Sequence, residues 1–119
     1  MTAADDHETL IAQVAGAPGD RPRAIHDLVL RLAPGAEPIV SYRMPAFRLD
    51  GRILIYFASF KYHTGVYPPL KPDHVFPELR PFMGPKGNFQ FPHSSALPLD
   101  IIERLITVRI AEVRARGRN

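Results

Sequence analysis

The stretch Ala46-Phe47-Arg48-Leu49-Asp50-Gly51-Arg52-Ile53-Leu54-Ile55-Tyr56-Phe57 decides the fold. Asp50-Gly51 stands between two apolar runs, and Asp-Gly in that setting is the strongest short-range signal for a β-hairpin. We therefore predict two antiparallel strands joined at Asp50-Gly51, with the second strand continuing to Phe60.

Further strands flank this hairpin on both sides. Residues 39–42 form a short apolar strand before it, and Pro45 then interrupts the pattern in a way that suits a bulge or a sheet edge. A tight turn at residues 61–63 leads back through residues 64–67, and residues 87–91 alternate apolar and polar side chains. The pattern predicts an antiparallel meander of about five strands.

Helical periodicity marks both ends of the chain. A first helix places three apolar residues on one face, Leu10, Ile11 and Val14. We expect Gly16 to stop it, and we expect a second helix to be capped by Asp20 with Pro22 in its first turn. A third helix should run from about residue 98 to residue 114, with a broad apolar stripe.

The order helix, helix, sheet, helix predicts an α+β fold. In this two-layer sandwich the N-terminal and C-terminal helices pack on one face of the meander sheet, and residues 1–119 form a single domain. The other face of the sheet would be free to meet solvent or a ligand.

Composition excludes several classes of protein. The chain has no cysteine, which removes disulfides, thiolate metal sites and cysteine nucleophiles. No apolar run approaches the roughly 20 residues that cross a bilayer, and the acidic N-terminus lacks the layout of a signal peptide. We therefore expect a cytoplasmic protein without a membrane partner. The net charge of +3 is too small to favour nucleic-acid binding.

Signatures of catalysis are missing from the sequence. It contains no nucleophile elbow, no phosphate-binding P-loop and no dinucleotide fingerprint. His63 could act as an acid or base near neutral pH, but no nucleophile or cofactor motif accompanies it. An enzyme is therefore the less favoured hypothesis, and no catalytic residue is assigned.

Acidic residues in the first helix have two interpretations. Asp5, Asp6 and Glu8, with His7 among them, could offer oxygen and imidazole ligands to iron or another divalent cation. Early acids also stabilise a helix by complementing its dipole and capping its N–H groups, which is the commoner role.

A cluster of aromatic and basic residues falls at the expected strand ends. Its candidate ligand-binding residues are Tyr42, Met44, Phe47, Lys61, His63, Tyr67 and Lys86. Because strand ends converge in a meander, aromatic walls and lysines there could hold a small molecule or a small anion. The alternative is that the aromatics fill the core and the lysines keep the sheet soluble.

Arg109 breaks the apolar stripe of the last helix. At about 100° per residue it projects between Leu105 and Val113. A long side chain there could extend to solvent, join a structural ion pair, or line the ligand pocket together with the strand-end cluster.

The strand-end motifs resemble those of the YdhG-like bacterial domain family of unknown function. The shared pattern reads Tyr-x-Met-Pro-Ala-Phe from Tyr42, Phe-Lys-x-His-x-Gly-x-Tyr-Pro from Phe60, and Lys-Gly-x-x-x-Phe-Pro from Lys86. A Leu-Pro pair at residues 97–98 and Arg109 complete it. The resemblance implies a helix–sheet–helix sandwich with a frataxin-like outline. Some relatives are described as intracellular iron chaperones, so iron as cargo and a carrier function are what the resemblance implies.

Overall fold

The computed structural model describes residues 3–12 and 17–117, with side chains described for residues 6–11 and 21–116. The elements in chain order are α1 (Ala3–Ala12), α2 (Ala17–Leu32), β1 (Glu37–Ser41), β2 (Met44–Leu49), β3 (Arg52–Ser59), β4 (His63–Tyr67), the 3₁₀ turns η1 (Pro72–His74) and η2 (Pro77–Phe82), β5 (Phe89–Pro92) and α3 (Leu99–Gly117). No helix in this part of the chain is both long and apolar enough to cross a membrane.

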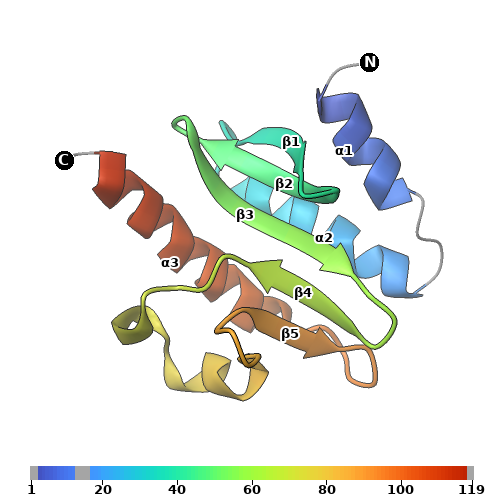
Figure 1. Cartoon of the computed structure of the whole chain (residues 1–119), viewed down its shortest axis with the longest axis vertical. Helices are drawn as coiled ribbons and strands as arrows, with labels where there is room; N and C mark the ends of the chain where they lie inside the picture. The colour runs from blue at the N-terminus through green and yellow to red at the C-terminus, as the bar shows by residue number, and fades with distance from the viewer. Residues whose placement is uncertain (1–2, 13–16, 118–119) are drawn as a thin grey trace.

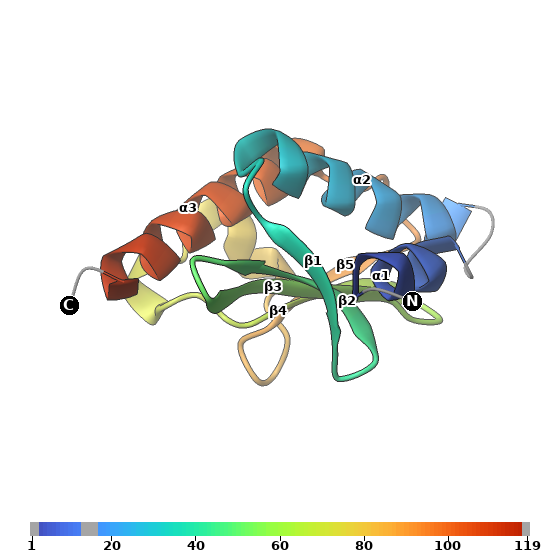
Figure 2. The same ribbon diagram turned by 90° about the horizontal axis from the view of Figure 1, so that it is seen from above.

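The five strands form one antiparallel sheet in the order β1-β2-β3-β4-β5 (Figure 1). The helices α2 and α3 lie across one side of the sheet, and α1 packs beside them against β1 and β2 (Figure 2). The predicted α+β sandwich, with its meander sheet and its helices on one face, is therefore confirmed. Within residues 3–12 and 17–117, no helix covers the opposite side of β2, β3 and β4, and we call that side the open face.

The predicted hairpin at Asp50-Gly51 is confirmed. Leu49 pairs with Arg52 across a two-residue turn, and both turn residues have positive φ, 52° for Asp50 and 78° for Gly51. Two positive φ values define the type I′ turn, whose twist matches that of the flanking strands. Asp tolerates the left-handed region better than most residues, and Gly adopts it freely.

The core lies between the sheet and the helices. Side chains of a strand alternate between faces, so Phe47, Phe57 and Val66 point to the helical side and are fully buried. Ile25 from α2 and Leu105 from α3 cover them. Burying a large apolar side chain stabilises the fold by about 1.5–3 kcal/mol, so this layer holds the two ends of the chain on one sheet face.

Two local predictions need correction. The helix α2 begins at Ala17, ahead of the predicted cap at Asp20, and Pro22 lies inside it instead of in its first turn. Proline removes one N–H bond to the preceding turn, and only about one turn of α2 precedes Pro22, so the loss is small. The predicted stop at Gly16 lies outside the described residues.

Candidate functional site

The sheet opens where β2 and β3 separate. In the described residues the β2–β3 ladder runs from Leu49↔Arg52 to Ala46↔Tyr56 and goes no further. Pro45 follows Ala46 on the side where the strands part, and proline has no N–H to donate to a ladder. Beyond that point β2 stays paired with β1 while β3 stays paired with β4. The sheet therefore splits, and a cleft forms between its two halves.

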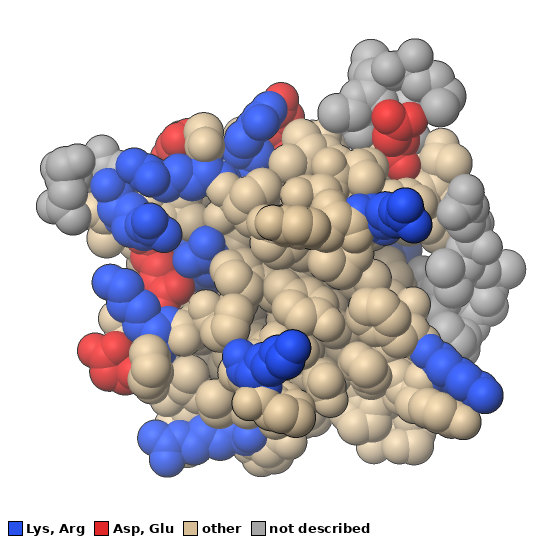
Figure 3. Space-filling view, in the orientation of Figure 1, with Lys and Arg blue, Asp and Glu red and all other residues tan. Residues whose placement is uncertain are grey.

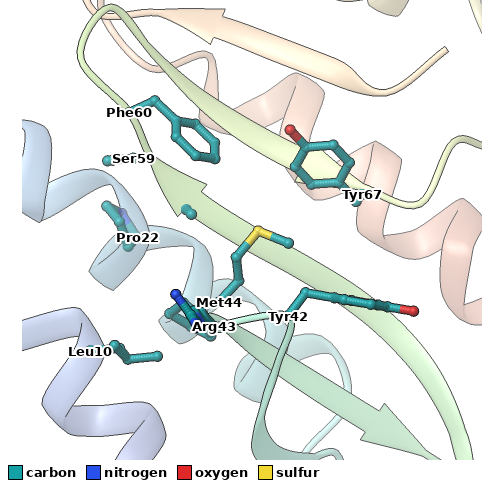
Figure 4. Close-up of a pocket in the computed structure, with 10 residues that line it drawn as sticks. Leu10, Pro22, Tyr42, Arg43, Met44, Ser59, Phe60 and Tyr67 are labelled. Atoms are coloured by element: carbon teal, nitrogen blue, oxygen red, sulfur yellow. The ribbon is translucent and has the colours of Figure 1, made fainter. Parts of the chain in front are cut away.

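This β2–β3 cleft has a volume of about 610 Å³, within the range of roughly 300–1,000 Å³ that is typical of small-molecule sites. It is lined by Leu10, Pro22, Tyr42, Arg43, Met44, Pro45, Ala58, Ser59, Phe60 and Tyr67 (Figure 4). Most of these residues are apolar or aromatic. The helical layer contributes Leu10 and Pro22, and the sheet contributes the remainder.

Small residues let two aromatic rings lie close to the sheet on the open face. Ala58 pairs with Gly65 across β3 and β4. A Cβ atom at Gly65 would stand 3.0 Å from Tyr67 Cε2 and 3.1 Å from Phe60 Cε2. Both rings can therefore occupy these positions only because Gly65 has no side chain. Figure 4 shows Phe60, Tyr67 and Met44 grouped around the cleft.

The turn between β1 and β2 carries Tyr42 and Arg43 in an unusual conformation. Their φ values are 52° and 60°, and Ser41 pairs with Met44 across them, so the turn is again type I′. Asn-Gly and Asp-Gly favour this turn, whereas a bulky residue in the left-handed region costs about 1–2 kcal/mol. Strain of this kind clusters at ligand-binding and catalytic sites.

Charge is sparse at the cleft. Among the lining residues that the structure describes, Arg43 alone carries a formal charge. Figure 3 looks onto the open face and shows uncharged surface over much of β3 and β4, with charged side chains gathered near the β2–β3 turn and the end of α3. Asp6 lines an adjoining hollow that also touches Arg43, but no ion pair joins these two described residues.

Ser59 is held beneath the cleft by a chain of hydrogen bonds. Its Oγ lies 3.0 Å from Thr64 Oγ1, which lies 3.0 Å from His93 Nε2. Burial, and then the nearby positive charge of Arg21, lower the pKa of His93. The imidazole is therefore neutral at neutral pH. Because Ser59 follows Ala58, strand alternation turns its hydroxyl toward the helical side, away from the open face.

The structure brings together three of the predicted binding residues. Tyr42, Met44 and Tyr67 all line the cleft. The ring of Tyr42 points away from Met44 (Figure 4) and packs edge-on to Tyr56 with centroids 5.6 Å apart. His63 lies beside the cleft, with its ring 5.2 Å from that of Phe60.

The other predicted binding residues lie elsewhere. Phe47 is fully buried in the core, stacked on Phe57. Lys61 is in the β3–β4 turn, with its Nζ 5.2 Å from the ring centroid of Tyr62. Lys86 precedes β5, and the pairing of His63 with Pro92 and Val66 with Phe89 puts the start of β5 at the opposite end of β4 from Lys61. The two lysines therefore do not converge.

Arg109 ties α3 to β3. Its guanidinium donates to the carbonyl oxygens of Leu54 at 2.8 Å and Ile53 at 2.9 Å, and to Glu112 at 3.2 Å. It also lines a smaller hollow of about 200 Å³ beside Tyr56 and Pro68. These bonds engage all three guanidinium nitrogens as donors. Arg109 therefore links α3 to β3.

Two residues of the predicted metal-binding stretch, Glu8 and His7, are engaged by other partners. Glu8 accepts hydrogen bonds from both terminal nitrogens of Arg23, and these bonds lower its pKa. His7 is buried, and its Nδ1 donates to the carbonyl of Ile39 at 3.0 Å. The side chain of Asp5 lies outside the described residues. Within the described part of the chain, no group of three or more His, Cys, Asp or Glu residues could hold a metal ion.

Several lining residues are not among the candidates predicted from the sequence. Leu10 and Pro22 come from the helices, and helical periodicity identifies them only as apolar. Arg43 and Phe60 stand within the quoted motifs, next to the candidates Tyr42 and Lys61. Arg43 reaches the cleft because its turn is type I′. A Tyr-Arg dipeptide does not indicate a type I′ turn, so the sequence holds no signal for this position.

Comparisons with known proteins establish the fold. A crystal structure of a Bacillus subtilis protein of the DUF1801 family (YdhG) is similar, with a TM-score of 0.76 over 91% of this chain and 90% of that chain, at 18% sequence identity. No family model matches the sequence, and no curated protein matches it either. This chain therefore has a YdhG-like fold, and at that identity the likeness concerns the fold alone.

Proposed function

We propose that this protein is a binding domain that holds a small, predominantly apolar molecule in the β2–β3 cleft. The main support for this proposal is the separation of β2 from β3, which opens a cleft of about 610 Å³ with an apolar and aromatic lining. Concave apolar sites with a few polar groups are the usual form of small-molecule sites. The apolar and aromatic lining suits the binding of an apolar ligand.

The fold likeness and the strand-end motifs also support membership of the YdhG-like family. Tyr42, Met44 and Tyr67 belong both to the family pattern and to the lining of the cleft. We propose that the family pattern preserves this cleft. Gly65 also belongs to the pattern, and its place under the rings of Phe60 and Tyr67 is a physical reason for glycine there.

A titration with a neutral bicyclic probe tests the binding proposal. Naphthalene-2-methanol would be added to the full chain and followed by ¹H–¹⁵N correlation spectra, with shifts expected at residues 42–44, 58–60 and 67. Replacing Ala58 with leucine adds three carbons to the cleft wall, so we expect the probe's affinity to fall about tenfold, roughly the effect of 1.4 kcal/mol.

The matched control for that variant is Ala96→Leu, since Ala96 is exposed and does not line the cleft. It should leave the probe's affinity unchanged. Thermal unfolding of each variant, followed by circular dichroism, checks that the fold persists. Shifts scattered away from the cleft, or equal affinities for wild type and Ala58→Leu, would refute this site.

Iron carriage, which the family resemblance implies, is the competing function. It rests on Asp5, Asp6 and Glu8, and the described contacts lend it no support because Arg23 already occupies Glu8. We expect anaerobic calorimetry with ferrous iron to detect no micromolar binding. Heat that appears with wild type and disappears with Glu8→Gln would instead favour the iron carrier.

A further inference from the structure

We infer that the ligand of the β2–β3 cleft is a planar apolar molecule bearing one carboxylate, and that Arg43 binds this carboxylate. This inference rests on the proposed function and names the ligand class for the same site. It is carried by three observations: the lone charge in the lining, the flat aromatic wall, and the conformation of the turn that presents Arg43.

Arg43 differs from most of the described arginines in its lack of a partner. Most described arginines are engaged by carboxylates or backbone carbonyls: Arg21, Arg23, Arg31, Arg48, Arg52, Arg104 and Arg109. Arg43 has neither a hydrogen bond nor an ion pair in the described residues, although it lines an apolar cleft. A guanidinium presents a planar fork of donors that matches a carboxylate. An incoming carboxylate would supply the missing partner.

The shape of the cleft favours a flat body. The rings of Phe60 and Tyr67 lie low over Gly65, and Ala58 adds only a methyl group beside them. Aromatic faces and edges attract other aromatic groups by about 0.5–1.5 kcal/mol beyond their area burial. The Met44 side chain points toward the same space (Figure 4) and can adapt to an irregular outline. A ring system fits between these side chains better than a branched aliphatic body.

The turn fixes where the positive charge stands. Arg43 and Tyr42 both adopt the left-handed region in a two-residue turn closed by Ser41 and Met44. Such a turn leaves the backbone little freedom, so the guanidinium starts from a defined position at the rim of the cleft. A site that is preorganised in this way binds its ligand at a lower entropic cost. The structure thereby explains why a strained turn carries an arginine here.

The same residues favour a carboxylate over a phosphate monoester. A phosphate dianion needs several charged or backbone donors, whereas Arg43 is the sole formal charge among the described lining residues. A nucleotide would also bury base edges that need hydrogen-bond partners, and the lining offers mostly apolar groups. One guanidinium over an apolar cleft suits one carboxylate on an apolar ring.

The test compares two probes of equal shape on the full chain. Naphthalene-2-carboxylate and naphthalene-2-methanol would each be titrated at low ionic strength, with ¹H–¹⁵N spectra as the readout, and adenosine monophosphate would be titrated in parallel. We expect wild type to bind the carboxylate about tenfold more tightly than the alcohol. A difference of this size is expected for one hydrogen bond to a charged group. Arg43→Gln should abolish that preference by lowering the affinity for the carboxylate to about that for the alcohol.

The matched control is Arg80→Gln, because Arg80 is also exposed and has no side-chain partner among the described residues. It removes the same charge far from the cleft and should keep the tenfold preference. Arg43→Lys, which retains the charge but loses the fork, should keep a smaller preference. Together these results would establish that the charge at position 43 determines the preference for the carboxylate.

Each contrary result has a defined meaning. If wild type binds both naphthalenes equally, the ligand class is wrong while the apolar cleft stands. A preference that survives in Arg43→Gln would overturn the role of Arg43. Tighter binding of adenosine monophosphate than of the carboxylate would replace the ligand class with phosphates. If neither naphthalene binds, the proposed function fails, and this inference fails with it.

Discussion

Glu112 is a buried carboxylate that links two segments of the chain. It accepts hydrogen bonds from His74 Nδ1 at 2.6 Å, from the Lys71 N–H at 3.0 Å and from Arg109 at 3.2 Å. Burial alone would raise its pKa, but these three bonds outweigh the burial and lower the pKa below the ordinary value of 4.5. The carboxylate therefore stays charged in the folded protein and links α3 to the segment after β4.

The lowered pKa of Glu112 predicts acid sensitivity. A depressed folded-state pKa contributes stability that is complete above the unfolded pKa of 4.5 and is lost as the pH falls through the folded value. Glu112→Gln should lower the free energy of unfolding by about 3 kcal/mol at pH 7, because it leaves Arg109 without its buried anion. The difference between wild type and variant should therefore shrink as the pH falls below 4.5, as measured by urea unfolding.

The control for this prediction lies on the same helix. Glu103 pairs with Arg31 at 2.8 Å, and both side chains are substantially exposed. Glu103→Gln should therefore change the free energy of unfolding by less than about 1 kcal/mol. A pH-independent difference for Glu112→Gln would contradict the assigned charge state.

At the scale of elements, the sheet contains two turns of the same type with different sequences. Asp50-Gly51 suits its type I′ geometry, whereas Tyr42-Arg43 does not. The first turn joins β2 to β3 where the ladder is complete, and the second lies at the end where the strands separate. Of these two turns, the one whose residues are unfavourable for type I′ geometry is therefore the one that borders the cleft. Residues that break a local preference are expected at functional sites.

Replacing the unfavourable turn should separate stability from binding. The double change Tyr42→Asn with Arg43→Gly should raise the free energy of unfolding by about 1 kcal/mol, since it removes two strained residues from the left-handed region. The same protein should lose its preference for naphthalene-2-carboxylate. Urea unfolding and the probe titration measure the two effects on one sample.

Asp50→Asn is the companion variant, because it changes a turn that already suits its geometry. It should alter neither the stability nor the binding by a measurable amount. Destabilisation by the Tyr42→Asn, Arg43→Gly pair would mean that the contact between Tyr42 and Tyr56 outweighs the backbone strain.

At the scale of the whole molecule, one side of the sheet forms the core and the other side borders the cleft. The helical side buries Phe47, Phe57, Phe89 and Phe91 completely. The open side carries the half-buried Tyr67 and the exposed Phe60, which border the cleft. Aromatic residues close together in sequence therefore serve the core or the cleft according to the strand face on which they lie.

This division predicts opposite phenotypes for two aromatic replacements. Phe47→Ala should lower the free energy of unfolding by about 3–5 kcal/mol, because it empties a packed core position. Tyr67→Ala should cost about 1 kcal/mol, the size of a typical surface or half-buried change, but should weaken binding of the naphthalene probes. Tyr62→Ala, an exposed aromatic outside the cleft, should affect neither property. A larger stability loss for Tyr67→Ala than for Phe47→Ala would contradict the division.

The elements and their order could be predicted from the sequence because their signals are local. Asp50-Gly51 between apolar runs defines a hairpin, and the apolar stripes at each end define helices. The α+β meander follows from these signals because short connections favour neighbouring antiparallel strands. The position of Pro22 inside α2 and the turn at Tyr42-Arg43 did not follow, since tertiary packing overrides local preference at both places.

Only the tertiary structure decided which residues share the site. Proximity in sequence grouped Lys61 and Lys86 with the aromatics, but strand pairing sends the two lysines to opposite ends of β4. Alternation buried Phe47 in the core and left Met44 half-buried at the cleft, although they are three residues apart. The parting of β2 from β3 then brought Leu10 and Pro22 from distant helices to the same cleft as Arg43. Short-range patterns determine the elements of this protein, and long-range packing determines its cleft, because side chains from separate elements meet only after the layers have assembled.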